Sequence, residues 1–242
     1  MSARPATELL PVPAVGRRFE AERSVRLGDV DTRGELRLDA IARYLQDVAT
    51  DDAIDAGLGN AMGWLVRRTM IRVVRPCVLN QRLRLITFCT GVGRSWAERR
   101  TTIDDGNGAA VEAVSLWVQI DITTGRPTRL GEGFFDRYGE AAAGRTVSSK
   151  LQLPGPPEGA ERRPWQFRTT DLDPFRHVNN AAQWAAPEAL LVGRDRVGTA
   201  ELEFLAPVGD DPIELVVAGD AAWLVHDGRT LSAFAWTAHD AG

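Results

Sequence analysis

The feature that most constrains the fold of this chain is an order of elements that occurs twice. Asp29-Val-Asp31 and Asp171-Leu-Asp173 lie 142 residues apart (171 − 29), and each precedes an apolar segment with helical periodicity. In both halves a short strand comes before this acidic turn, and four β-rich runs follow the helix. Because each half offers one apolar helix and one set of strands, the sequence predicts two similar α+β units in tandem.

The first unit is expected in residues 1–141. Apolar residues alternate from 19 to 27 as in a strand, and an amphipathic helix follows from 38 to about 57. A second, short helix is expected near the aromatic residues of 134–138. Four strands are expected between the two helices, at about 62–74, 83–92, 95–103 and 109–122.

Residues 142–164 are rich in Pro and Gly, which predicts a linker across the surface, and the second unit is expected in residues 165–242. In this unit we expect a strand at 165–169, a long helix at 179–192 and strands at 197–205, 213–217, 221–225 and 230–236. A sheet wrapped around each long helix would bury it, and the two sheets could pair at one edge. A cleft between the units would suit an elongated apolar ligand.

Composition excludes several classes of protein. The net charge of −4 argues against a nucleic-acid partner, and no apolar run reaches the roughly 18 residues of a membrane span. The N-terminus lacks the apolar stretch of a secretory signal, so a cytoplasmic location is expected. Cys77 and Cys89 lie in separate apolar runs, and the three histidines are scattered. We therefore expect no disulfide, no metal site and no cofactor.

Asp173 and His177 stand at the expected start of the second helix. Asp and Asn are common helix caps and turn residues, so these two positions, with Asn179 and Asn180, could be purely structural. The same place also suits catalysis, because a helix N-terminus stabilises an oxyanion that forms on a thioester carbonyl. A nearby carboxylate can attack that carbonyl or deprotonate a water, and a histidine can share the proton.

The segment from Asp171 to Asn180 resembles the Asp-x-Asp-x-x-x-His-Val-Asn-Asn signature of hot-dog-fold thioesterases. Together with the tandem layout, this makes residues 17–208 similar to the acyl-ACP thioesterase family, where ACP is acyl carrier protein. Weaker similarities to that family occur at residues 45–47, 64–72, 98–100 and 115–119. The resemblance implies a double hot-dog fold of class α+β, and hydrolysis of fatty acyl thioesters of ACP or CoA in lipid metabolism.

By the same resemblance, Asp173 and His177 match the catalytic aspartate and histidine of the family, and Phe175, Asn179 and Asn180 are expected to contact substrate. Three positions depart from the pattern. The asparagine that the family has between the two catalytic residues falls on Phe175, and its later Glu-Cys pair falls on Pro207 and Val208. Its tyrosine after His-Val-Asn-Asn falls on Gln183.

These departures leave two interpretations open: Asp173 suffices for hydrolysis, or the protein binds acyl thioesters without rapid turnover. A hydratase is disfavoured, because its Asp-x-Asn-Pro-x-His segment has another spacing and contains an asparagine missing here. Glu35 takes the place of His177 in the first unit, which suggests one working site per chain. The first unit would then supply the acyl-chain pocket. Ile41, Leu45 and Val48 could line this pocket, but ordinary core packing is the favoured interpretation for each of them. A homodimer is possible.

Overall fold

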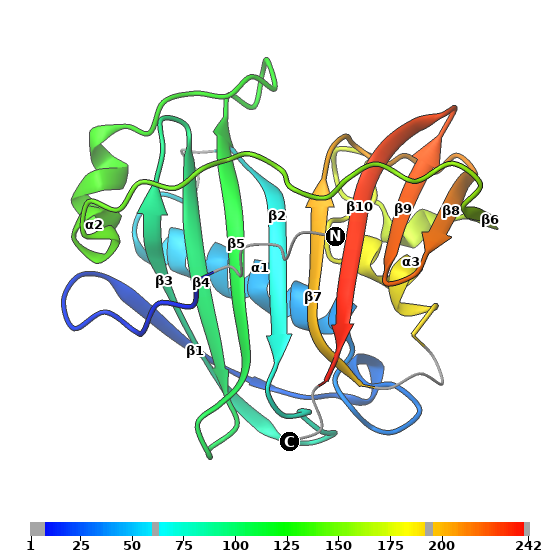
Figure 1. Ribbon diagram of the computed structural model, residues 1–242. Coiled ribbons are helices and arrows are strands. Elements are labelled where there is room, and N and C mark those ends of the chain that lie inside the picture. Colours follow the sequence, from blue (N-terminus) through cyan, green and yellow to red (C-terminus); the bar gives the residue numbers. More distant parts are fainter. Residues whose placement is uncertain (1–7, 60–62, 192–195, 240–242) are drawn as a thin grey trace.

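The computed structural model describes residues 8–59, 63–191 and 196–239. Its strands form one ten-stranded antiparallel sheet in the order β1-β3-β4-β5-β2-β7-β10-β9-β8-β6 (Figure 1). The strands are β1 (Arg18–Ser24), β2 (Gly63–Val73), β3 (Arg82–Val92), β4 (Trp96–Asp104), β5 (Ala109–Ile120), β6 (Glu161–Trp165), β7 (Val197–Phe204), β8 (Ile213–Ala218), β9 (Ala221–His226) and β10 (Arg229–Ala238).

The sheet is two copies of one arrangement joined at a central pair. From the junction outward the first half runs β2-β5-β4-β3-β1 and the second half runs β7-β10-β9-β8-β6. At the junction β2 pairs with β7, from Arg68 opposite Glu203 to Arg72 opposite Thr199. The tandem layout is therefore confirmed, and the two units share one sheet as expected.

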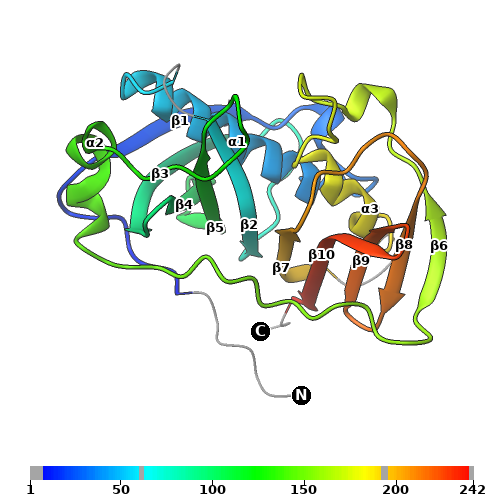
Figure 2. The same ribbon diagram turned by 90° about the horizontal axis from the view of Figure 1, so that it is seen from above.

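Helix α1 (Leu38–Asp55) lies on one face of the sheet, and the linker crosses the opposite face (Figures 1 and 2). The inward side of α1 carries apolar residues at helical spacing, and Ile41, Leu45 and Val48 are buried there. Helix α2 (Glu132–Ala142) packs at the outer end of the first half, where the short helix was predicted. None of the helices in the described ranges is long and apolar enough to cross a membrane.

The second half departs from the sequence prediction in two places. The expected long helix at 179–192 is, over its described residues 179–191, a 3-10 turn, Ala182–Trp184, followed by the single turn of α3 (Ala185–Glu188); residue 192 lies outside the described ranges. Pro187 interrupts the helical bonding between these two turns, because it has no N–H to donate to the carbonyl of residue 183. The preceding strand is β6, at Glu161–Trp165, so the strand predicted at 165–169 was placed too late and the linker ends earlier.

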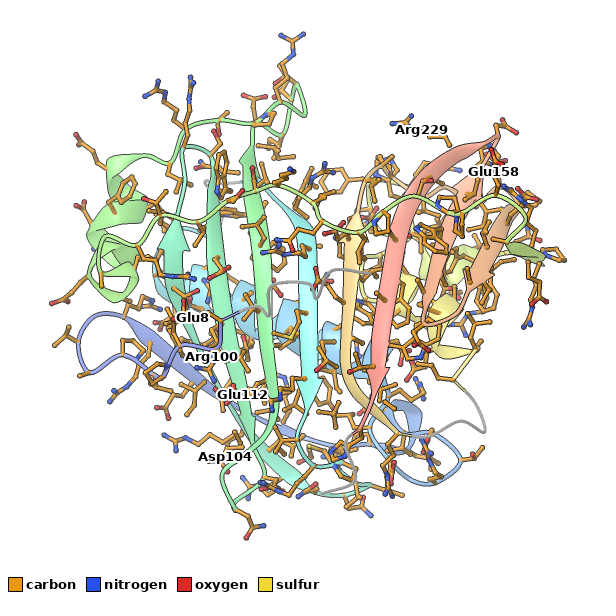
Figure 3. All side chains as sticks on the ribbon, viewed as in Figure 1. Glu8, Arg100, Asp104, Glu112, Glu158 and Arg229 are labelled. Carbon is orange, nitrogen blue, oxygen red and sulfur yellow. The ribbon has the colours of Figure 1, made fainter. Side chains whose placement is uncertain are left out.

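The linker is held by side chains on the face of the sheet opposite α1. Both carboxylate oxygens of the buried Glu203 accept backbone N–H groups, from Gln152 at 2.6 Å and Leu153 at 3.0 Å. The indole N–H of Trp223 donates to the carbonyl of Pro154 at 2.7 Å. On the same face, below the linker in this view, Arg100 of β4 and Glu112 of β5 form an ion pair of 2.6 Å (Figure 3). Apolar contacts add to these on the same face, where Leu153 and Ala160 pack against a buried cluster that includes Trp223.

Candidate active site

The predicted site segment folds into a tight, hydrogen-bonded loop. The backbone N–H of Asp173 donates to the carbonyl of His177 at 2.7 Å. One carboxylate oxygen of Asp173, Oδ1, accepts the backbone N–H groups of Phe175 at 2.9 Å and His177 at 3.1 Å. Arg176 turns the chain with a φ of +62°, a conformation that non-glycine residues seldom adopt. The loop therefore fixes one oxygen of the Asp173 carboxylate.

The first half contains the same loop, 142 residues earlier. Oδ1 of Asp31 accepts the backbone N–H groups of Arg33 at 2.8 Å and Glu35 at 3.0 Å. The turn residue there is Gly34, with a φ of +76°. The match continues into the following helices: Ile41 N–H donates to the Arg37 carbonyl, and the equivalent Gln183 N–H donates to Asn179. The weak repeat in the sequence is therefore a close structural repeat.

A cavity of about 360 Å³ lies in the first half, and the loop of the second half stands at one end of it. Helix α1 forms one wall and strands β2 to β5 form another, while α2 closes the end remote from the loop (Figures 1 and 2). The cavity is lined by Gln46, Ala49, Thr50, Ala53, Leu58, Gly59, Trp64, Leu65, Cys89, Ala97, Glu98, Arg99, Trp117, Phe134, Tyr138, Asp173, Pro174, Phe175, Asn179 and Asn180.

The structure brings four of the five predicted site residues to this cavity: Asp173, Phe175, Asn179 and Asn180. Phe175 is 70% exposed, so it lies at the mouth and is not a buried wall. Asn179 also caps the following turn, because its Oδ1 accepts the backbone N–H of Ala181 at 2.8 Å. Its capping role and its place at the cavity are therefore compatible.

His177 is the predicted residue that the cavity does not include. Its side chain is exposed, and among the described residues its imidazole has no hydrogen-bond partner. Only its backbone is paired with Asp173. In the first half the equivalent Glu35 forms an ion pair with Arg196. The two loops thus share their backbone and differ in the use of this side chain.

The cavity wall lies on another side of α1 than Ile41, Leu45 and Val48, for which ordinary core packing was the favoured interpretation of the sequence. Ile41, Leu45 and Val48 belong to the core cluster, whereas the wall is formed by Gln46, Ala49, Thr50 and Ala53. These four recur at helical spacing and would lie on one stripe of the helix. The signal that could have found them is a run of small and polar residues beside the apolar stripe, since small side chains leave room.

Large aromatic rings pack together in the described interior of the second half. Trp184 packs edge-to-face on Phe234 with ring centroids 5.6 Å apart, and Phe234 lies 5.3 Å from Trp236. All three belong to the core cluster. The units are therefore similar in backbone and different in interior packing.

The end of the cavity near α2 contains paired charges. Asp52 is buried and accepts hydrogen bonds from Arg99 at 2.6 Å and Arg17 at 2.7 Å, and the Arg99 guanidinium lies 5.4 Å from the centre of the Tyr138 ring. Burial raises the pKa of the Cys89 thiol to about 11, so this thiol is protonated at neutral pH. Cys89 is therefore a poor nucleophile there.

The position matched to the second of the two family helper residues is apolar. Val208 is fully buried, and its carbonyl accepts the backbone N–H of Val178 at 2.7 Å, which joins it to the Asp173 loop. Among the described residues, no group of three or more His, Cys, Asp or Glu side chains is arranged to hold a metal ion. Of the acidic side chains in 171–173, Asp173 is the one at the cavity.

Two solved structures resemble this fold over nearly its whole length. The 12:0-ACP thioesterase from Umbellularia californica matches with a TM-score of 0.75 and 18% identity, covering 93% of this chain and 98% of that one. An acyl-ACP thioesterase from Bacteroides thetaiotaomicron matches with a TM-score of 0.76 and 17% identity, covering 90% and 96%. The chain is thus a tandem hot-dog protein of class α+β, as predicted.

Comparison of the amino-acid sequence with protein families identifies the family within this fold class. Residues 16–138 match the model of the acyl-ACP thioesterase N-terminal domain, so the chain belongs to the acyl-ACP thioesterase family. Uncharacterized proteins of Mycobacterium tuberculosis strains H37Rv and CDC 1551 are each 30% identical over 164 residues. That match spans 67% of this chain and 66% of the length of those relatives.

Proposed function

We propose that this protein hydrolyses fatty acyl thioesters of ACP or CoA to the free acid and thiol. The observation that carries the proposal is the cavity of the first half, which has the Asp173 carboxylate at one end. Most of its lining is apolar, as an acyl chain requires, and the loop end is polar. Family membership supports the same reaction.

Asp173 is proposed as the general base. Its Oδ1 is held by two backbone N–H groups, while Oδ2 accepts no hydrogen bond from any described residue. Oδ2 can take a proton from a water as that water attacks the thioester carbonyl. The carbon–sulfur bond then breaks, the proton passes to the departing sulfur, and the free acid and thiol leave.

Asp173→Asn tests this role without disturbing the loop, because the amide Oδ1 still accepts the two N–H groups. Thiol release should fall by a factor of about 100 or more, as removal of a general base commonly produces. Asp31→Asn is the matched control, since it makes the same change in the equivalent loop away from the cavity. The assay should use a range of chain lengths on both ACP and CoA.

Equal activity of Asp173→Asn and wild type would exclude this mechanism, and a wild type inert on every substrate would exclude hydrolysis. His177→Ala in the same assay tests whether His177 shares the proton with Asp173 or takes no part in proton transfer. A shared Asp/His proton predicts a loss similar to that of Asp173→Asn, whereas the exposed position of the His177 ring predicts a much smaller one.

The alternative function is acyl-thioester binding without rapid turnover. Specific observations favour it: Val208 is apolar where the family has a polar helper, Phe175 replaces an asparagine, and the His177 ring is not at the cavity. Tight binding of an acyl thioester, with no thiol released over hours, would support this alternative.

A further inference from the structure

In the first half, the place equivalent to the Asn180 end of the cavity is occupied by a carboxyl group of the chain itself. Glu188, from α3 of the second half, reaches the start of α1, and its carboxylate accepts the backbone N–H of Leu38 at 2.7 Å and of Asp39 at 3.3 Å. The first half therefore binds a carboxylate of the chain itself, supplied by the other half.

The repeat identifies the corresponding groups at the cavity. Leu38 corresponds to Asn180, which lies 142 residues later, and Glu188 corresponds to Gln46 of α1, which lies 142 residues earlier. Gln46 and Asn180 both line the cavity beside Asp173. The matched hydrogen bonds of the two loops, and of the turn after each loop, support this correspondence.

The two places differ in their occupants. Among the described residues, neither the backbone N–H of Asn180 nor the side-chain amide of Gln46 has a hydrogen-bond partner. In the first half the equivalent N–H is satisfied by the Glu188 carboxylate. The Asn180 N–H thus has no acceptor among the described residues, and the side chain beside it at the cavity can donate an N–H, which a carboxylate cannot.

We propose that Gln46 binds the carbonyl oxygen of the substrate, with its side-chain N–H and the backbone N–H of Asn180 as the two donors. The inference rests on the proposed function and adds a residue of the first half to its site. The carbonyl oxygen would take the place that Glu188 fills at Leu38. Such donors strengthen their bonds as negative charge develops on that oxygen, which lowers the barrier to attack.

Two substitutions test this role. Gln46→Ala removes one donor, so kcat should fall by a factor of about 100 while KM changes little. Gln46→Glu recreates the arrangement of Glu188: its carboxylate should accept the Asn180 N–H, occupy the oxygen site and abolish turnover. Its Tm should equal or exceed that of wild type, whereas a merely structural glutamine would give a lower Tm on replacement. Gln166→Glu, at an exposed position, is the matched control.

Binding measurements separate this inference from the proposed hydrolysis. The probes are two acyl-CoA analogues that cannot be hydrolysed: a ketone with methylene in place of sulfur, and a thioether without the carbonyl. Gln46→Ala should weaken binding of the ketone about fivefold and leave the thioether unchanged, even if wild type releases no thiol. Equal effects on both analogues, or wild-type kcat in Gln46→Ala, would overturn the proposal.

Discussion

Glu188 provides a quantitative test of how the two halves are held together. Its carboxylate belongs to α3 and bonds to the first turn of α1, so it joins the two units in addition to the β2–β7 pairing. Burial raises the pKa of Glu188 to about 7 from an ordinary 4.5, and the N–H group of Leu38 offsets only part of this rise. Glu188→Gln removes the titrating group and keeps one acceptor oxygen.

The sign of the pH dependence follows from the raised pKa. The folded protein binds this proton more tightly than the unfolded chain, so its stabilising effect is complete below pH 4.5 and is lost as pH rises through about 7. One pKa unit corresponds to about 1.4 kcal/mol, which gives an upper limit of about 3.5 kcal/mol for the loss. Glu188 is partly exposed, and this contact with solvent reduces the loss below that limit.

Urea unfolding between about pH 5 and pH 8 measures the effect. The free energy of unfolding should fall with rising pH in wild type and much less in Glu188→Gln. Carboxylates with a lowered pKa, such as Asp31 and Asp171, titrate below this range in both states. Glu158→Gln, on the exposed linker (Figure 3), should leave the slope unchanged. Parallel slopes for wild type and Glu188→Gln would refute the reasoning.

Two further predictions concern the cavity and the loop. Ala53→Phe fills part of the cavity, so the ratio of kcat/KM for long over short acyl chains should fall about tenfold, while the exposed neighbour Ile54→Phe should leave it unchanged. A ratio unaltered by Ala53→Phe would mean that the chain binds elsewhere. Arg176→Gly relieves a left-handed backbone that Gly34 occupies in the first loop, and should raise the unfolding free energy by about 0.5–1 kcal/mol in urea titrations. A lower value would show that the arginine side chain stabilises the loop.

The sequence was sufficient for the fold because the constraints that set it are periodic. Alternation marked the strands and helical spacing marked α1, while the shared Asp-x-Asp turn gave the repeat. Periodicity failed around Pro187, where one residue without an N–H interrupts the helical hydrogen bonding although the apolar pattern continues. It also failed at β6, where Pro164 lies in an edge strand, a position that tolerates proline.

The site was predictable only in part. Asp173, Asn179 and Asn180 follow one another closely in the sequence, so one motif could locate them together. Gln46 and the small residues of α1 join them only through tertiary packing, across more than half of the chain. Whether a residue such as Ala49 lines a cavity or fills a core depends on the side chains opposite it, and no local pattern contains that information.

The two units that meet at the β2–β7 junction belong to one chain, so a single substitution alters only one of them. In a dimer of identical units, each change in the gene would appear in both subunits, and an altered helix would alter both sites at once. Here the corresponding places are encoded separately, so Gln46 and Glu188 could become different residues. Covalent fusion thus frees one unit to be optimised for rigidity while the other keeps the open space that a ligand needs.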